Sequence, residues 1–191
     1  MIRVTKAFLP LLKCQAYERS HCLARIVNVG SVAGLIASGA TSSYNGSKFA
    51  AEAFSASLRQ EMRSLDVSVV TVNPSFHRTP LTSALGDNLR RVWDGIAPDL
   101  RGEYGEGFFR KLKKKTEQNI MWDPETVVDE ILSCVELKRP PPQVIIGSDA
   151  KYTIMALLLF PVWLREWIVF TATGASELIP ARMEKSVEIE N

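Results

Sequence analysis

Cysteine is scarce in this sequence, which limits the redox chemistry open to the chain. The 191 residues include 3 cysteines, Cys14, Cys22 and Cys134. A small, odd number does not make a disulfide framework, so we expect reduced thiols and an intracellular protein. His21, beside Cys22 and near Cys14, lacks the CxxC or HxxxH spacing of a zinc site, so we predict no metal.

Charge of one sign is not in excess, and long apolar runs are absent. The chain has 23 Lys and Arg against 21 Asp and Glu, a net charge of +2, which argues against general nucleic-acid binding.

The uncharged stretch Ile154–Leu164 is shorter than the roughly 20 residues of a membrane span. We expect residues 151–175 to form an apolar helical segment, kinked at Pro161, that covers a pocket or lies on a membrane surface.

A third absence concerns phosphate binding. The chain has no GxxxGxG or GxGxxG turn after a strand near its N-terminus, and no acidic or basic residue placed to bind a ribose there. Turns of this kind hold the pyrophosphate of a dinucleotide against a helix N-terminus. We therefore predict that these 191 residues, on their own, bind no dinucleotide.

Among the residues that are present, Tyr44 and Lys48 have the clearest chemistry. They are four residues apart at the start of a helical pattern that runs to Leu65, which places both side chains on one helix face. An ammonium one turn from a phenol favours the phenolate, so Tyr44 is a candidate general acid/base for an alcohol or a carbonyl. The same spacing also fits a half-buried tyrosine beside a solvated lysine, so the upstream residues decide between the two interpretations.

A short strand precedes this pair. Ile26, Val27 and Val29 are β-branched and are followed by Gly30 and Ser31, a pattern that predicts a buried strand ending in a turn. In open α/β sheets, ligands bind at the carboxyl ends of the strands. We therefore expect the Ser31 hydroxyl and the Tyr44 phenol to converge on one substrate oxygen.

These motifs resemble the short-chain dehydrogenase/reductase family. The resemblance rests on V-N-V-G-S-V-A-G at residues 27–34, a tyrosine thirteen residues after Ser31, and a lysine four residues later. The sequence K-F-A-A-E-A-F-S-A-S-L-R-Q-E-M that begins at Lys48 is similar to the branch with retinol, 17β-hydroxysteroid and 3-hydroxybutyrate dehydrogenases. The resemblance covers about residues 2–170.

The resemblance implies an α/β fold, the C-terminal half of a doubly wound, parallel-sheet (Rossmann-type) domain with three strands and helices on both faces. It implies that residues 1–191 form one partial domain without its dinucleotide-binding half. Ser31, Tyr44 and Lys48 would be catalytic, with Ser31 binding the substrate oxygen. NAD or NADP would be the cofactor, contacted by Tyr44, Lys48, Pro74 and Thr79.

The segment after the second predicted strand, 67–73, resembles the family's PGxxxT motif, with Ser75 in place of glycine. If this position needs a left-handed backbone, Ser75 is a strained choice. We interpret His77 as a solvent-facing loop residue, with a second acid/base as the alternative. Residues 80–119, interrupted by glycines, correspond to the family's substrate-covering region.

Periodicity predicts the remaining elements. A helix over 4–17, with a bend or early break at Pro10, has an apolar side made of Val4, Phe8, Leu11, Leu12 and Ala16. The helix 44–65 carries an apolar stripe made of Phe49, Ala53, Phe54, Leu58 and Met62. A helix that begins at Asp123-Pro124-Glu125 has an apolar side made of Val127, Val128, Ile131, Leu132 and Val135. Val144–Gly147 is the last strand.

The expected function is that of an NAD(P)-dependent oxidoreductase that interconverts an alcohol and its carbonyl on a hydrophobic, steroid-like or retinoid-like substrate, with the 191 residues alone inactive. The alternative is a non-catalytic fragment associated with a membrane or a partner. We expect a homo-oligomer through the Tyr44–Leu65 helix, and an intracellular location with peripheral contact at the endoplasmic reticulum or mitochondrial membrane. The basic run Lys111–Lys115 is a solvated helix face, or else a contact for anionic lipid.

Overall fold

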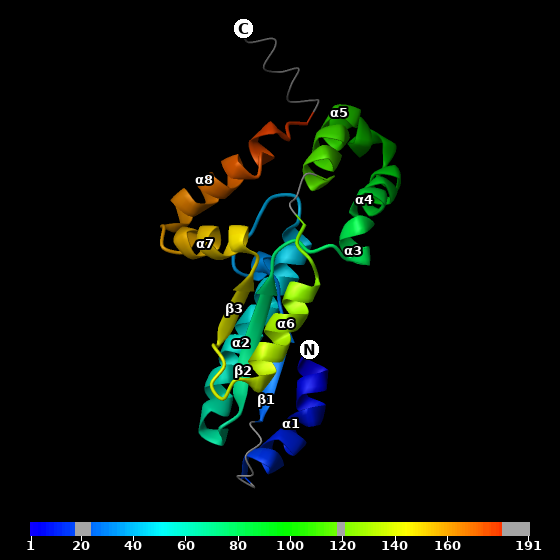
Figure 1. The fold of residues 1–191 in the computed structure, drawn as a ribbon. Coiled ribbons are helices and arrows are strands. Elements are labelled where there is room, and N and C mark those ends of the chain that lie inside the picture. Colours follow the sequence, from blue (N-terminus) through cyan, green and yellow to red (C-terminus); the bar gives the residue numbers. More distant parts are fainter. Residues whose placement is uncertain (18–23, 118–120, 181–191) are drawn as a thin grey trace. The chain divides into compact units, whose positions relative to one another are not determined.

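A computed structural model describes residues 1–17, 24–117 and 121–180. Three parallel strands form one sheet in the order β1-β2-β3 (Figure 1). The strands are β1 (Arg25–Val29), β2 (Ser68–Pro74) and β3 (Gln143–Ile146). Val27 lies opposite Val70 and Val72 opposite Val144, as expected for parallel strands rich in β-branched residues. The predicted α/β fold class is therefore confirmed.

Helices cover both faces of this sheet. On one face, α1 (Ile2–Tyr17) and α2 (Ser42–Met62) pack through Leu9, Leu12 and Leu58 against a cluster that includes Val69. On the other face, α6 (Glu125–Glu136) packs through Val127, Ile131 and Cys134 against Val70 and Val72. Side chains of a strand alternate between the faces, so β2 supplies both cores, and its central residues are almost fully buried.

The predicted apolar side of α1 is wrong in part. Val4, Phe8 and Leu11 are exposed, whereas Leu9, Leu12 and Ala16 pack against the core. The packing residues follow a spacing of three and four, so they form one stripe of the helix. The helix continues through Pro10, so the early break that we considered does not occur.

Two other helix faces differ from the prediction in the same way. In α6, Val127 and Ile131 are packed, but Val128, Leu132 and Val135 are exposed. In α2, Leu58 and Met62 are buried and Phe54 is packed, but Phe49 and Ala53 are exposed. Both sequences are apolar around much of the helix, so the sequence pattern alone does not identify the side that meets the sheet.

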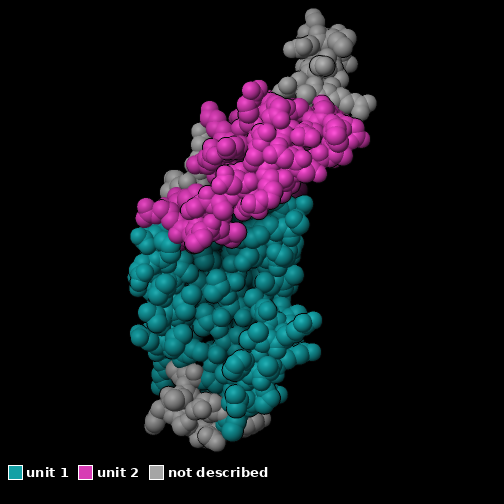
Figure 2. All heavy atoms as spheres, turned by 90° about the vertical axis from the view of Figure 1, so that its right-hand side faces the viewer, with its two compact units in different colours: residues 1–75, 122–161 teal, residues 76–121, 162–191 magenta. Residues whose placement is uncertain are grey.

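The chain divides into two compact units, coloured teal and magenta in Figure 2. The first, residues 1–75 and 122–161, holds the sheet with α1, α2 and α6, and also α7 (Ser148–Leu157). The second, residues 76–121 and 162–191, holds α3 (Pro80–Ser83), α4 (Leu85–Asp94), α5 (Pro98–Glu117) and α8 (Val162–Ala172).

Ring contacts hold α4 against α5 in the second unit. The Trp93 and Phe109 rings stack with centroids 5.1 Å apart, and the Arg90 guanidinium lies over the Phe109 ring at 5.1 Å. Gly95 follows the end of α4, and Gly105, at φ 78°, kinks α5. The expected interruption by glycines therefore occurs at these two positions.

The apolar segment 151–175 is divided into two helices. The first of them, α7, ends at Leu157, and α8 begins at Val162, directly after Pro161. A proline at this point has no N–H to continue a helical hydrogen-bond ladder. Within residues 1–17, 24–117 and 121–180, no helix combines the length and the apolarity that a bilayer span requires.

Candidate active site

Hydrogen bonds at the end of β1 hold Gly30 and Ser31 in place. The Gly30 N–H donates to the Val72 carbonyl at 2.8 Å. The Ser31 N–H donates to Asn73 Oδ1 at 2.9 Å, and Ser31 Oγ accepts from the Ala33 N–H at 3.2 Å. Ser31 thereby caps the short 3-10 turn η1 (Val32–Gly34). Because a hydroxyl has one proton and two lone pairs, this cap leaves the Ser31 proton for another acceptor.

The first turns of α2 carry Tyr44 and Lys48, as predicted. Lys48 Nζ lies 5.7 Å from the centroid of the Tyr44 ring and donates to the Gly30 carbonyl at 2.9 Å. This bond places the lysine ammonium on the residue that precedes Ser31. Tyr44 is 44% exposed, so the residue is open to solvent.

Gly34 and Asn45 fix how the turn η1 and the loop after it meet α2. A Cβ at Gly34 would lie 2.7 Å from the Lys48 carbonyl oxygen, shorter than any normal contact, so η1 packs directly on the backbone of α2. Asn45, which is buried, donates to the Ser38 carbonyl at 2.8 Å. This bond closes the loop between η1 and α2 and fixes where the helix begins.

Two residues of this region were not predicted, Glu52 and Asn73. Glu52 Oε2 accepts from Asn73 Nδ2 at 3.2 Å, and Glu52 Oε1 accepts from Thr71 Oγ1 at 3.2 Å and from the Gln143 side chain. One signal for Glu52 was available, because it continues the spacing of four from Tyr44 and Lys48 along one helix face. Asn73 gave no such signal, since its contact with Ser31 depends on the register of two strands.

The Pro74–Thr79 segment corrects two expectations. Ser75 is not left-handed, since the non-glycine residues of positive φ in the described chain are Ala40 and Asp66. The Ser75 N–H donates to the Ile146 carbonyl at 2.9 Å, so serine fits this position without the strain that we considered. His77 is only 5% exposed, so its interpretation as a solvent-facing residue is wrong. Its backbone carbonyl accepts from Thr82 Oγ1 at 2.7 Å.

Thr79 begins α3 in the second unit. Its hydroxyl accepts from the Thr82 N–H at 3.3 Å, and the Thr79 N–H donates to the Thr82 hydroxyl at 2.9 Å. This reciprocal cap satisfies N–H groups at the helix start. The contact of Thr79 with a nicotinamide ring stays a prediction.

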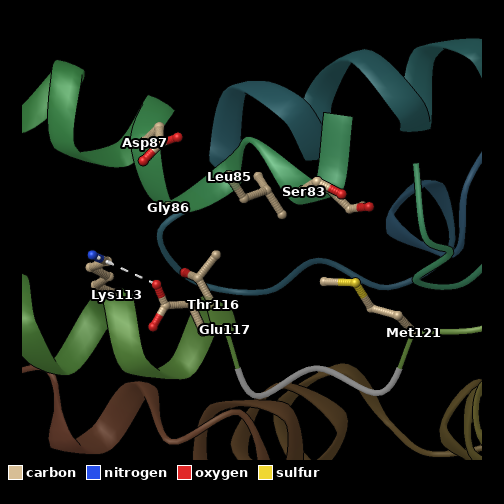
Figure 3. A pocket seen from close by; sticks show the side chains of 9 residues that line it. Ser83, Leu85, Gly86, Asp87, Lys113, Thr116, Glu117 and Met121 are labelled. Carbon is tan, nitrogen blue, oxygen red and sulfur yellow. Dashed lines mark ion pairs between the residues drawn. The ribbon is translucent and has the colours of Figure 1, made fainter. Parts of the chain in front are cut away.

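The second unit contains a cavity of about 220 Å³. Leu85 and Met121 line it together with polar side chains of α3, α4 and α5, and the Lys113–Glu117 ion pair of 3.7 Å lies at its wall (Figure 3). The cavity therefore has a mixed polar and apolar lining, and it lies in the region that the family resemblance assigns to substrate covering.

The basic run on α5 contains two lysines in ion pairs with glutamates. Lys113 contacts Glu117, and Lys115 Nζ contacts Glu177 at 3.1 Å, while Lys111 and Lys114 are exposed. The prediction of a solvated helix face therefore holds for part of the run. No group of three or more His, Cys, Asp or Glu side chains placed to hold a metal lies in the described part of the chain. His21 and Cys22 lie outside it.

Comparison with known structures identifies the class of fold. A short-chain dehydrogenase from Streptomyces avermitilis superposes with a TM-score of 0.58 at 20% identity, covering 92% of this chain and 58% of that one. A short-chain dehydrogenase from Burkholderia cenocepacia, solved in complex with NADP, gives a TM-score of 0.56 at 19% identity, over 84% of this chain and 54% of that one. The fold is therefore the Rossmann-type α/β fold of short-chain dehydrogenases.

Sequence comparison identifies the family. Residues 1–90 match the family described as short chain dehydrogenase. Retinol dehydrogenase 5 of Mus musculus is 36% identical over 159 residues, 78% of this chain and 46% of that protein. Retinol dehydrogenase 16 of Rattus norvegicus is 31% identical over 93% of this chain and 55% of that protein. The 3beta-hydroxysteroid dehydrogenase dhs-16 of Caenorhabditis elegans is 29% identical over 97% of this chain and 48% of that protein.

The chain belongs to the short-chain dehydrogenase/reductase family, in the branch with retinol and hydroxysteroid dehydrogenases. It spans about half the length of these curated relatives.

Proposed function

We propose that the protein is an NAD(P)-dependent oxidoreductase that interconverts an alcohol and its carbonyl on a hydrophobic, retinoid-like or steroid-like substrate. The observation that carries this proposal is the bond of Lys48 Nζ to the Gly30 carbonyl, with the same ammonium 5.7 Å from the Tyr44 ring. One contact region thus joins Tyr44, Lys48 and the residue before Ser31. The relatives of this chain that are named retinol dehydrogenase and 3beta-hydroxysteroid dehydrogenase support the proposed substrate class.

In this mechanism, Tyr44 Oη gives a proton to the substrate oxygen during reduction and takes one during oxidation. The Ser31 hydroxyl donates a hydrogen bond to the same oxygen and keeps its proton. It can do so because its contact with the Ala33 N–H uses only a lone pair. Lys48 Nζ, 5.7 Å from the centroid of the Tyr44 ring, keeps a hydrogen-bond donor beside the phenol. The nicotinamide supplies or accepts hydride when it is bound.

The residues present fit one end of a dinucleotide cofactor. The Lys48 ammonium is a donor group at the carboxyl end of the sheet, where ribose hydroxyls could accept from it. Pro74 ends the next strand, and the family resemblance implies nicotinamide contacts for both Pro74 and Thr79. The sequence has no glycine-rich turn for the pyrophosphate, so the fit of these residues is limited to the nicotinamide end of the cofactor.

The proposal includes a location and an assembly. Trp163 and Trp167 on α8 are 71% and 60% exposed, and indole rings favour the interface between water and lipid. This exposure supports peripheral contact with an intracellular membrane. Phe49 and Ala53 on α2 are exposed as well, which supports an oligomer that pairs this helix with its copy.

Substitution of the phenol tests the proposed function. In the full-length protein, Tyr44→Phe should abolish nearly all turnover and leave cofactor affinity almost unchanged, because only the phenolic proton is removed. Lys48→Ala should lower both. The measurements are NAD(P)H absorbance with a panel of steroid and retinoid alcohols, and a cofactor titration. Substantial turnover by the Tyr44→Phe protein would exclude this role.

A further inference from the structure

Asn73 links the serine loop to the helix that carries Tyr44 and Lys48. Its side chain is completely buried. Its Oδ1 accepts from the Ser31 N–H at 2.9 Å, and its Nδ2 donates to Glu52 Oε2 at 3.2 Å. One amide group thus connects the end of β1 to α2 through the end of β2.

Glu52 determines which way this amide points. An ionised carboxylate only accepts hydrogen bonds, whereas an amide has one donor end and one acceptor end. The Asn73 nitrogen therefore faces Glu52, and its oxygen faces the Ser31 N–H. Glu52 is itself held by Thr71 and by Gln143 from β3, so this orientation depends on all of these contacts.

The contact with the serine loop is tight. A Cβ at Gly30 would lie 2.2 Å from Asn73 Oδ1, so the amide oxygen lies directly against the peptide that precedes Ser31. The same peptide unit receives the Lys48 bond at its carbonyl. A shift of the Asn73 side chain would therefore move both the Ser31 hydroxyl and the partner of Lys48.

We propose that Asn73 is a positioning residue of the reaction, which acts through Ser31, and that Glu52 fixes the orientation of its amide. This inference rests on the proposed function. Asn73 does not touch the reacting atoms. It holds the Ser31 hydroxyl at the distance and angle from Tyr44 at which both groups can bond to one substrate oxygen.

Exchanging the two polar groups gives a direct test. Asn73→Asp places a carboxylate opposite the Glu52 carboxylate, where neither can donate and the charges repel. The double variant Asn73→Asp with Glu52→Gln restores one donor at position 52 and one acceptor at position 73, with the same total charge. It also keeps an oxygen at position 52 for Thr71 and Gln143.

In the full-length protein, Asn73→Asp should lower kcat about 100-fold, the loss expected when a reacting group is misplaced by about 1 Å. KM should change little, because the Ser31 bond is strongest in the transition state. The double variant should recover most of the lost kcat. Stoichiometric cofactor titration counts the folded sites, so that loss of folded protein is not scored as loss of turnover.

Asn28→Asp is the matched control. Asn28 is also buried, on the neighbouring strand, and its Nδ2 donates to Ser55 Oγ at 2.9 Å. This variant buries a carboxylate of equal size without changing the contact to Ser31. It should lower stability and leave the kcat of folded sites close to that of wild type.

The results separate this inference from the proposed function. An inactive wild-type protein would refute the proposed function. An active wild type with full kcat in Asn73→Asp, or a double variant no better than Asn73→Asp, would overturn the role of Asn73 alone. A second measurement needs no activity: hydrogen exchange of the Ser31 amide should accelerate in Asn73→Ala relative to the Val70 amide in the core. Unchanged exchange at Ser31 would also overturn the inference.

Discussion

Gly30 offers a sharp test of the packing at the serine loop. In Gly30→Ala, the new Cβ would lie 2.2 Å from Asn73 Oδ1, so the Asn73 side chain must shift and lose its bonds to Ser31 and Glu52. Each buried polar group left without a partner costs about 1–3 kcal/mol, while Gly→Ala stabilises through the unfolded chain by about 0.4–1 kcal/mol. Two such groups, less this gain, give an expected net loss in the free energy of unfolding of about 1–5.6 kcal/mol.

Urea denaturation followed by circular dichroism measures this loss. Gly46→Ala is the matched control, because a Cβ there meets nothing within 4 Å and Gly46 lies inside α2. The control should be more stable than wild type by about 0.5–1 kcal/mol, as alanine is in helix interiors. If Gly30→Ala is as stable as Gly46→Ala, the described contact between Gly30 and Asn73 is wrong.

Three further predictions concern other parts of the chain. Burial, and to a lesser extent the Glu130 carboxylate, raises the pKa of the Cys134 thiol above 9.0, while Arg25 acts in the opposite direction. The protein should therefore lose stability as the pH rises through that raised pKa. Cys134→Ala should remove this dependence in alkaline denaturation curves. The 191 residues alone should bind neither NAD(H) nor NADP(H) in isothermal titration, because the pyrophosphate lacks a glycine turn; micromolar binding would refute this account. Replacing Trp163 and Trp167 by serine should release the protein from anionic vesicles in a sedimentation assay, and sedimentation equal to that of wild type would assign these side chains another role.

The strands and the shared helix face of Tyr44 and Lys48 were predictable because they depend on local sequence pattern. The runs of β-branched residues predicted β1 and β2, with the observed bounds to within a residue or two. The spacing of four between Tyr44 and Lys48 predicted a shared helix face, and the structure places the ammonium near the phenol ring. Each of these inferences needed only the geometry of one element.

The remaining features depend on contacts between distant segments. The burial of His77 depends on the fold of its loop, which no periodicity encodes. The packed side of α1 includes Leu9 rather than Phe8, because the helix is apolar on several sides and the sheet selects one of them. The Asn73–Ser31 bond joins residues of two strands, so it appears only once their register is known.

The regular spacing of Tyr44, Lys48 and Glu52 along α2 makes the site sensitive to changes in chain length. An α-helix turns by about 100° per residue, so one residue inserted between Lys48 and Glu52 would turn the carboxylate away from Asn73 while both ends of the helix stayed intact. An insertion in the loop before α2 would leave all three side chains in phase, provided that the Asn45–Ser38 bond formed again. Related proteins should therefore vary in length before Thr41 and keep the segment from Tyr44 to Glu52 free of insertions and deletions.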